Sequence, residues 1–251
     1  MNVSVDEMTG LLADAKKNIH SFDTVLTRFE KTNTKNYGRT MPRWVPDYEE
    51  TLQLISDTLT IYIPENANLA DLGAGTGRAS KRLLADFPAV SINLVDYSAN
   101  MLSECEQTLA EFNGRYKTTV ANLFDSDFTV GQGEYHATVS TFAICHGRRK
   151  EQYLKLYQTI FKGLKPGGCF ICFDHIAGAT DQLTALNMMN WHNFLAPEFD
   201  HATRQEIVGS TYEEDTPLSF TTHANLLQQA GFTAVDLLWK KQIFGIYIGI
   251  L

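Results

Sequence analysis

Three glycines at alternate positions, in the segment Gly-Ala-Gly-Thr-Gly at residues 73–77, constrain this chain more than any other feature. The apolar run at 68–72 predicts a short buried strand before them, and residues 78–87 predict a helix after them. Glycine is needed because the loop must take positive φ values and let a ligand approach bare backbone. The start of the helix offers unpaired backbone N–H groups. This order of elements indicates a nucleotide-type binding site.

The spacing of the glycines narrows the choice of ligand. A dinucleotide site requires G-x-G-x-x-G, and a P-loop requires a following Lys-Ser or Lys-Thr pair, and the loop has neither pattern. Asp96 ends the next predicted strand, at 92–96, where an acid that binds ribose hydroxyls is expected. The chain has an acid, this glycine loop, a strand and a second acid in that order. This order resembles that of class I S-adenosylmethionine (SAM)-dependent methyltransferases. The resemblance implies SAM as cofactor and S-adenosylhomocysteine as product.

Length and charge limit the partners of the chain. With 251 residues, 44% of them hydrophobic, it can bury one sizeable core. The net charge of −8 disfavours a broad nucleic-acid surface, because phosphates are neutralised by Lys and Arg. The sequence shows no membrane-spanning apolar run and no signal-peptide pattern, and four cysteines fit a reducing compartment. We expect a cytoplasmic protein with a small-molecule substrate, no membrane contact, and a homodimer as one option.

Strands and helices alternate along the sequence, which predicts a Rossmann-like α/β fold. We expect a doubly wound, mainly parallel seven-stranded sheet that ends in an antiparallel C-terminal hairpin. Residues 1–48 are expected to form an N-terminal helical cap segment with two short helices, which either covers the pocket or is a solvated extension. Residues 49–251 are expected to form the SAM-binding domain, with a helical insertion at about 178–215. The strands are expected at 68–72, 92–96, 118–122, from 135, at 169–175, 233–239 and 243–250; the helices at 48–61, 78–87, 100–112, 151–164 and 220–229.

The carboxyl ends of the strands in such a sheet face the ligand crevice. Asn122 and Leu123 end the third predicted strand, so we expect an amide beside the exocyclic amine of adenine and an apolar side chain against its ring. A turn cap is the alternative role for Asn122. The predicted cofactor-binding residues are Tyr48, Asp71, Gly73, Ala74, Gly75, Gly77, Asp96, Tyr97, Met101, Asn122, Leu123 and Thr141.

A closer resemblance begins with Arg43-Trp-Val-Pro-Asp-Tyr48, which matches an R-x-V-P-x-Y entry motif. Over roughly residues 41–251 the chain resembles the carboxy-SAM synthase of tRNA wobble-uridine modification and its methyltransferase relatives. The resemblance implies that Tyr48 lies over the cofactor. The segment Trp-His-Asn-Phe at 191–194 falls where that family has His-His-Asp-Phe, and Thr-His at 222–223 matches the helix before the final hairpin.

The chain departs from the synthase at three places. Its loop has the ordinary methyltransferase form where the synthase has Gly-Cys-Ser. Val208 stands where the synthase has an arginine that holds the carboxylate of its product, and Arg204 is the nearest arginine. Thr141 replaces an asparagine on the fourth strand. Carboxy-SAM synthesis, or another step of tRNA modification, is therefore the alternative to methyl transfer, and a non-catalytic SAM-binding protein is the second alternative.

The cofactor brings an electrophilic methyl group, so the enzyme mainly has to position a nucleophile and exclude water. Whether oxygen, nitrogen or carbon accepts the methyl group is open, and a hydroxyl or phenol acceptor would also benefit from a histidine base. Three histidines at predicted strand ends or in the insertion are the candidate catalytic residues: His146, His175 and His192. A solvated helix start is the alternative for His146, and a plain strand end is the alternative for His175. Aromatic residues that could line an acceptor pocket are Tyr37, Trp44, Tyr48, Phe142, Trp191 and Phe194.

Asp174 beside His175 could orient that histidine as a base. Together with His192 and His146, these groups also suit zinc, iron or manganese. Their spacing has no recognised ligand signature, so the sequence predicts no metal site.

Overall fold

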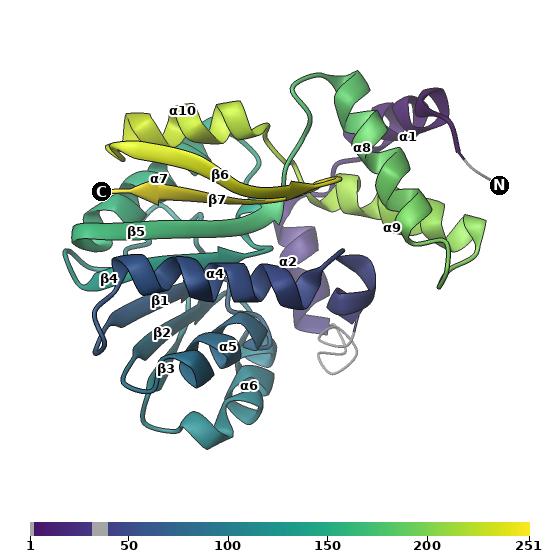
Figure 1. The fold of residues 1–251 in the computed structure, drawn as a ribbon. Helices are drawn as coiled ribbons and strands as arrows, with labels where there is room; N and C mark the ends of the chain where they lie inside the picture. The colour runs from purple at the N-terminus through teal and green to yellow at the C-terminus, as the bar shows by residue number, and fades with distance from the viewer. Residues whose placement is uncertain (1–2, 32–39) are drawn as a thin grey trace.

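The structure is a computed structural model and describes residues 3–31 and 40–251. Seven strands form one sheet in the order β3-β2-β1-β4-β5-β7-β6 (Figure 1). The first five pair in parallel, and β7 runs antiparallel to both β5 and β6. This confirms the predicted doubly wound sheet with a closing hairpin. The strands are β1 (Asn68–Leu72), β2 (Ser91–Asp96), β3 (Tyr116–Val120), β4 (Tyr135–Thr141), β5 (Leu164–His175), β6 (Ala234–Lys241) and β7 (Phe244–Ile250).

Helices cover both faces of the sheet (Figure 1). One face packs against α4, α5 and α6, and the other packs against α7 and α10. Successive side chains of β5 point to opposite faces of the sheet. Cys169 and Phe173 pack in the hydrophobic core on the side of α4, α5 and α6, and Phe170 and Cys172 pack in the core on the side of α7 and α10. The helices are α1 (Val5–Lys17), α2 (Phe22–Lys31), α4 (Tyr48–Tyr62), α5 (Arg78–Asp86), α6 (Ala99–Thr108), α7 (Lys150–Gly163), α8 (Asp181–Phe194), α9 (His201–Glu214) and α10 (Phe220–Ala230), with 3-10 turns η1 (Ala110–Phe112) and η2 (Ile144–His146).

The two helices predicted near the N-terminus are present as α1 and α2, and the predicted insertion contains α8 and α9. The helix α1 packs against α8 and α9, beyond the carboxyl ends of the central strands (Figure 1). Ser4 caps α1 with a capping box to Glu7, and Asp200 caps α9 through the N–H of Thr203. The division into a cap segment and a domain stays a prediction. Among the described residues, no helix is long and apolar enough to cross a membrane.

Several predicted boundaries differ from the structure. The third strand lies two residues earlier than expected, and a 3-10 turn follows the shorter helix α6. Residues 165–168, which lie between the expected helix at 151–164 and the expected strand at 169–175, are inside β5, because Leu164 already pairs with Tyr135. A register shift before the pair Ala137 and Cys169 accommodates the extra residues, with Gly167 at φ +77°. Strand pairing therefore overrides the local turn propensity of Pro-Gly-Gly.

Candidate active site

Backbone hydrogen bonds fix the glycine loop at the end of β1. The N–H groups of Gly73 and Ala74 both donate to the carbonyl of Val95, at 2.7 and 3.0 Å. The N–H of Gly75 donates to the Asp96 carboxylate at 2.8 Å. The loop is thus attached to the end of β2, and Asp96 is held beside it.

All three glycines of the loop have positive φ angles, but an added Cβ atom would have different surroundings at each of them. A Cβ atom at Gly73 would lie 2.1 Å from the Cβ of Ala143, and one at Gly77 would lie 2.6 Å from the sulfur of Cys105. A Cβ atom at Gly75, where φ is +53°, would meet no atom within 4 Å. Gly73 and Gly77 are therefore required for packing, whereas Gly75 leaves bare backbone facing open space.

A cavity of about 870 Å³, including the solvent at its mouth, opens beside this loop. We call it the first cavity. It lies at the carboxyl ends of β1, β2 and β4, where a doubly wound sheet binds its ligands. The predicted cofactor-binding residues that line it are Tyr48, Gly73, Ala74, Gly75, Asp96, Tyr97, Met101, Asn122, Leu123 and Thr141.

Asp71 and Gly77, the other two predicted cofactor-binding residues, do not line the first cavity. Asp71 is buried and accepts a hydrogen bond from the Ser80 hydroxyl at 2.6 Å. Burial raises the pKa of Asp71 to about 6, although the Ser80 hydrogen bond acts in the opposite direction. Asp71 thus ties β1 to α5 from beneath the loop.

Tyr48 and Asn122 both line the first cavity. The Arg78 guanidinium lies over the Tyr48 ring, 5.3 Å from its centroid, and burial raises the pKa of the phenol to about 12. The Asn122 amide donates to Asp125 at 2.7 Å and accepts from the N–H of Phe124 at 3.0 Å. Asn122 therefore makes the turn cap foreseen as its alternative role, while it also lines the cavity.

A second cavity, of about 630 Å³ with its solvent, adjoins the first. The two cavities share Met41, Phe142 and His146 as lining residues. Phe142 has φ +54°, an unfavourable conformation for a bulky residue. Its N–H donates to the carbonyl of Phe173 at 2.9 Å, and its ring lies 4.6 Å from the Phe173 ring. Tight packing thus holds strained backbone at the border between the cavities, as functional sites often do.

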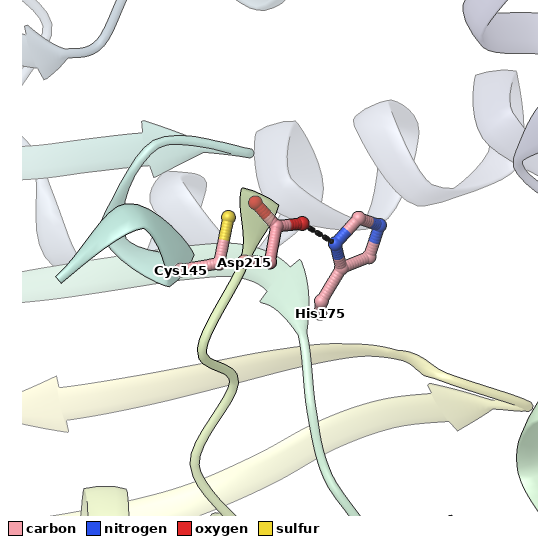
Figure 2. A group of neighbouring side chains, drawn as sticks. All are labelled: Cys145, His175 and Asp215. Atoms are coloured by element: carbon pink, nitrogen blue, oxygen red, sulfur yellow. Dashed lines mark hydrogen bonds and ion pairs between the residues drawn. The ribbon is translucent and has the colours of Figure 1, made fainter. Parts of the chain in front are cut away.

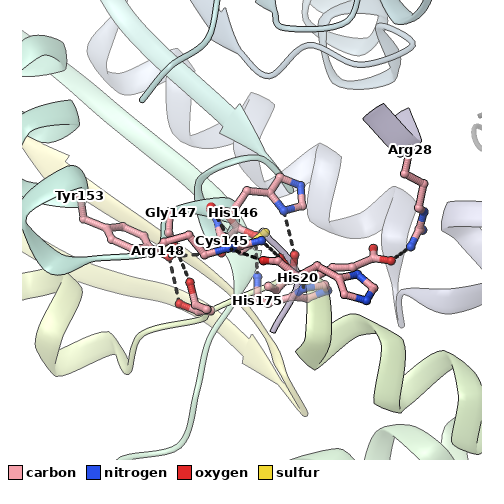
Figure 3. Close-up of polar contacts among 12 residues, drawn as sticks. His20, Arg28, Cys145, His146, Gly147, Arg148, Tyr153 and His175 are labelled. Atoms are coloured by element: carbon pink, nitrogen blue, oxygen red, sulfur yellow. Dashed lines mark hydrogen bonds and ion pairs between the residues drawn. The ribbon is translucent and has the colours of Figure 1, made fainter. Parts of the chain in front are cut away.

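Asp215 brings two of the predicted catalytic histidines together in the second cavity (Figures 2 and 3). Its carboxylate lies 2.5 Å from Nδ1 of His175 and 2.9 Å from Nδ1 of His146. Burial alone would raise the pKa of Asp215, but His146 and His175 outweigh it and hold the pKa well below its usual range. Burial alone would lower the pKa of His175, and the carboxylates of Asp215 and Asp174 reverse this to a raised pKa.

The Asp174 carboxylate accepts hydrogen bonds from backbone N–H groups and not from an imidazole ring. Its carboxylate accepts the N–H of Cys145 and the N–H of His175, both at 2.8 Å. Burial raises the pKa of Asp174. The expectation that Asp174 orients the His175 ring is therefore corrected, because Asp215 makes that contact. Sequence reasoning missed Asp215, whose only local signal was an acid directly after a helix.

His192, the third candidate, lines neither cavity. It is fully buried, its carbonyl accepts a hydrogen bond from Arg204 at 3.2 Å, and its ring lies 5.3 Å from that of His201. Of the aromatic candidates, Phe142, Trp44 and Trp191 line the second cavity, and Tyr48 lines the first. Phe194 lines neither, and Tyr37 lies outside the described residues.

Known proteins match both the sequence and the fold. A family model described as a methyltransferase domain matches residues 69–168. The carboxy-S-adenosyl-L-methionine synthase of Pseudoalteromonas atlantica is 26% identical, over 84% of this chain and 87% of that protein. The synthase of Campylobacter lari is 24% identical, over 82% and 86%. The structure of an O-methyltransferase family protein from Burkholderia thailandensis shares the fold, with a TM-score of 0.63 and 17% identity, over 98% of this chain and 70% of that one.

Proposed function

We propose that this chain, a SAM-dependent enzyme of the class I methyltransferase type that resembles carboxy-SAM synthases, methylates an oxygen nucleophile of a small molecule. One observation carries the proposal. His146, held by Asp215, lines both cavities, so a single imidazole faces the place of the cofactor and the place of an acceptor.

The first cavity fits SAM by its shape and its polar groups. Gly75 leaves the space that a Cβ atom would fill, and Asp96 is held by the N–H groups of Gly75 and Ser98, both at 2.8 Å. We assign Asp96 to the ribose hydroxyls, and Asn122 and Leu123 to adenine. SAM supplies an electrophilic methyl group when it is bound.

The second cavity offers an acceptor aromatic walls and a polar corner at His146 and Asp215, and Arg28 and Glu214 also line it. Trp44, Trp191 and Phe244 line it, and the rings of Trp191 and Phe244 meet edge to face with centroids 5.5 Å apart. Such walls suit a flat, apolar acceptor and exclude water. His146 accepts the proton of the acceptor hydroxyl, and Asp215 keeps the imidazole in position, as a carboxylate does for a catalytic histidine. We therefore propose a phenol-like acceptor.

Calorimetry with SAM and S-adenosylhomocysteine, followed by a screen of phenols with labelled SAM, tests this function. We expect binding of both SAM and S-adenosylhomocysteine and transfer of the methyl group to a phenol. His146→Gln should lower kcat by about 10²- to 10⁴-fold, the usual contribution of a general base, and should change SAM affinity far less. His136→Gln is the matched control, because His136 lies on β4, the strand that precedes the turn of His146, but lines neither cavity. The proposal would be contradicted if neither SAM nor S-adenosylhomocysteine bound, or if the two variants transferred the methyl group at equal rates.

Carboxy-SAM synthesis is the second candidate, and the two synthase relatives favour it. The side chains of α9 do not supply the cation that this product needs. Val208 is fully buried, and Arg204 lines neither cavity and donates to the carbonyl of His192. Arg28 lines the second cavity and forms an ion pair with Glu214. Mass spectrometry of the SAM-like compound that copurifies with the protein distinguishes the two functions. A carboxylated SAM would mean that the function is carboxy-SAM synthesis and not methyl transfer.

The cytoplasmic location, the absence of a nucleic-acid partner and a homodimer stay predictions. The cap role of α1 and α2 is also a prediction. Its support is that α2 supplies Arg28 to the wall of the second cavity.

A further inference from the structure

We propose that Cys145, His175 and Asp215 bind a divalent transition metal ion, with Zn²⁺ as the best match, and that the bound metal inhibits the enzyme. The three residues come from η2, the end of β5 and the segment after α9, and they meet at one wall of the second cavity (Figure 2). Metal binding itself does not depend on the proposed methyl transfer, whereas inhibition rests on it.

The distances between the ligand atoms are close to those of a metal site. The Cys145 sulfur, a His175 ring nitrogen and an Asp215 oxygen all lie within 4.8 Å of one another. Zinc bonds of about 2.0 to 2.3 Å place tetrahedral ligands roughly 3.3 to 3.8 Å apart. Closing the site therefore requires the widest ligand pair to come together by about 1 Å at most, while His175 Nδ1 and the Asp215 oxygen, now 2.5 Å apart, separate by about the same amount.

A shared carboxylate fixes the backbone beneath two of the ligands. Asp174 accepts the N–H of Cys145 and the N–H of His175, so the relative position of these residues is set before any ion binds. Cys145 and Asp215 are only 3% and 5% exposed, so bulk water competes little for the ion. Metal sites commonly rely on such hydrogen bonds behind their ligands.

The donor set selects the kind of ion. One sulfur, one imidazole nitrogen and one carboxylate oxygen suit zinc and related transition metals, whereas magnesium and calcium prefer oxygen ligands alone. Three protein ligands leave a fourth position, which can be filled by water or by His146, whose Nδ1 lies 2.9 Å from Asp215. On binding, the ion displaces the thiol proton of Cys145 and the proton that His175 shares with Asp215, both protons pass to solvent, and no electron is transferred.

Inhibition follows from the shared residues. An ion on Asp215 and His175 removes the carboxylate that holds His146 and fills the polar corner where the acceptor hydroxyl would sit. Zinc should therefore lower the rate of methyl transfer, and a chelator should restore it.

Cobalt(II) tests the site directly, because its absorption spectrum reports its ligands. Titration of chelator-treated full-length protein should give one ion per chain and a thiolate-to-cobalt charge-transfer band, which Zn²⁺ abolishes. Cys145→Ala should lose the band, and Cys169→Ala should keep it, because Cys169 is a buried cysteine outside the cluster. Asp215→Asn should weaken cobalt binding at least tenfold. Urea unfolding of each variant shows that it has folded, whether or not it binds SAM.

The outcomes separate the two proposals. Absence of a charge-transfer band in the wild-type protein, or an equal band in Cys145→Ala, would overturn the metal site whatever the enzyme methylates. A band without any methyl transfer would support the metal site and count against the proposed function. A rate that rises with zinc would overturn inhibition.

Discussion

Replacing Gly75 by alanine should damage cofactor binding out of proportion to its effect on stability. Gly75 has φ +53°, and an added Cβ atom would meet no protein atom within 4 Å. Gly133 is a matched control, since it has φ +61° and the same open space but does not line the first cavity. The two substitutions add the same methyl group to the same kind of backbone, and only one adds it where SAM should lie.

The sizes of the two effects follow from this comparison. An L-residue in the left-handed region costs about 1 to 2 kcal/mol, so both variants should lose about that much unfolding free energy. At Gly75 the methyl group also crowds the bound cofactor, and overpacking of this kind costs about 1 to 3 kcal/mol. The Kd for SAM should therefore rise roughly 5- to 150-fold in Gly75→Ala. It should stay at the wild-type value in Gly133→Ala.

Urea unfolding measures the stability of the two variants, and calorimetry measures their affinity for SAM. Equal Kd values for Gly75→Ala and the wild type would refute the assignment of the loop to the cofactor. An equal loss of affinity in both variants would mean that the loss comes from the fold as a whole.

Two further predictions concern Asp96, which is hydrogen-bonded to the glycine loop, and His223, which is buried. Asp96→Ala should weaken SAM binding at least tenfold, about 1.4 kcal/mol, in calorimetry, and unchanged affinity would remove Asp96 from the ribose site. Burial lowers the pKa of His223 from 6.5 to about 3, so the unfolded chain binds its proton first as pH falls and stability drops between those values. From pH 8 to pH 5 this histidine should cost about 2 kcal/mol in urea unfolding. His223→Gln should lose that part of the pH dependence, and an unchanged dependence would contradict the assignment.

The residues of the site that could be predicted from the sequence lie close to one another along the chain. The glycine loop and Asp96 lie at the ends of two neighbouring parallel strands, so strand pattern and spacing place them together. Asp215 could not be found this way, because it is 40 residues from His175 and only the packing of α9 brings it there. Sequence spacing reports periodicity within an element and carries little information on contacts between distant elements.

His192 illustrates a different limit. It follows Trp191 on α8, and successive residues on a helix point about 100° apart. Trp191 faces the second cavity and donates its indole N–H to the carbonyl of Trp44 at 2.7 Å. With that side chain in the wall, His192 is turned into the interior beside Arg204. The sequence placed the segment near the acceptor pocket but did not show which side chain faces it.

The loop and the proposed base are mechanically coupled through the exit of β4. Gly73 lies against Ala143 so closely that a Cβ atom would clash at 2.1 Å, and Ala143 connects Phe142 to the turn that carries His146. A shift of the glycine loop therefore presses on the backbone that positions His146. Because methyl transfer requires the nucleophile to lie in line with the methyl group, we expect a side chain at position 73 to lower the rate of transfer as well as the affinity for SAM. The glycine at position 73 thus serves the geometry of both cavities, although it was recognised only as part of a cofactor loop.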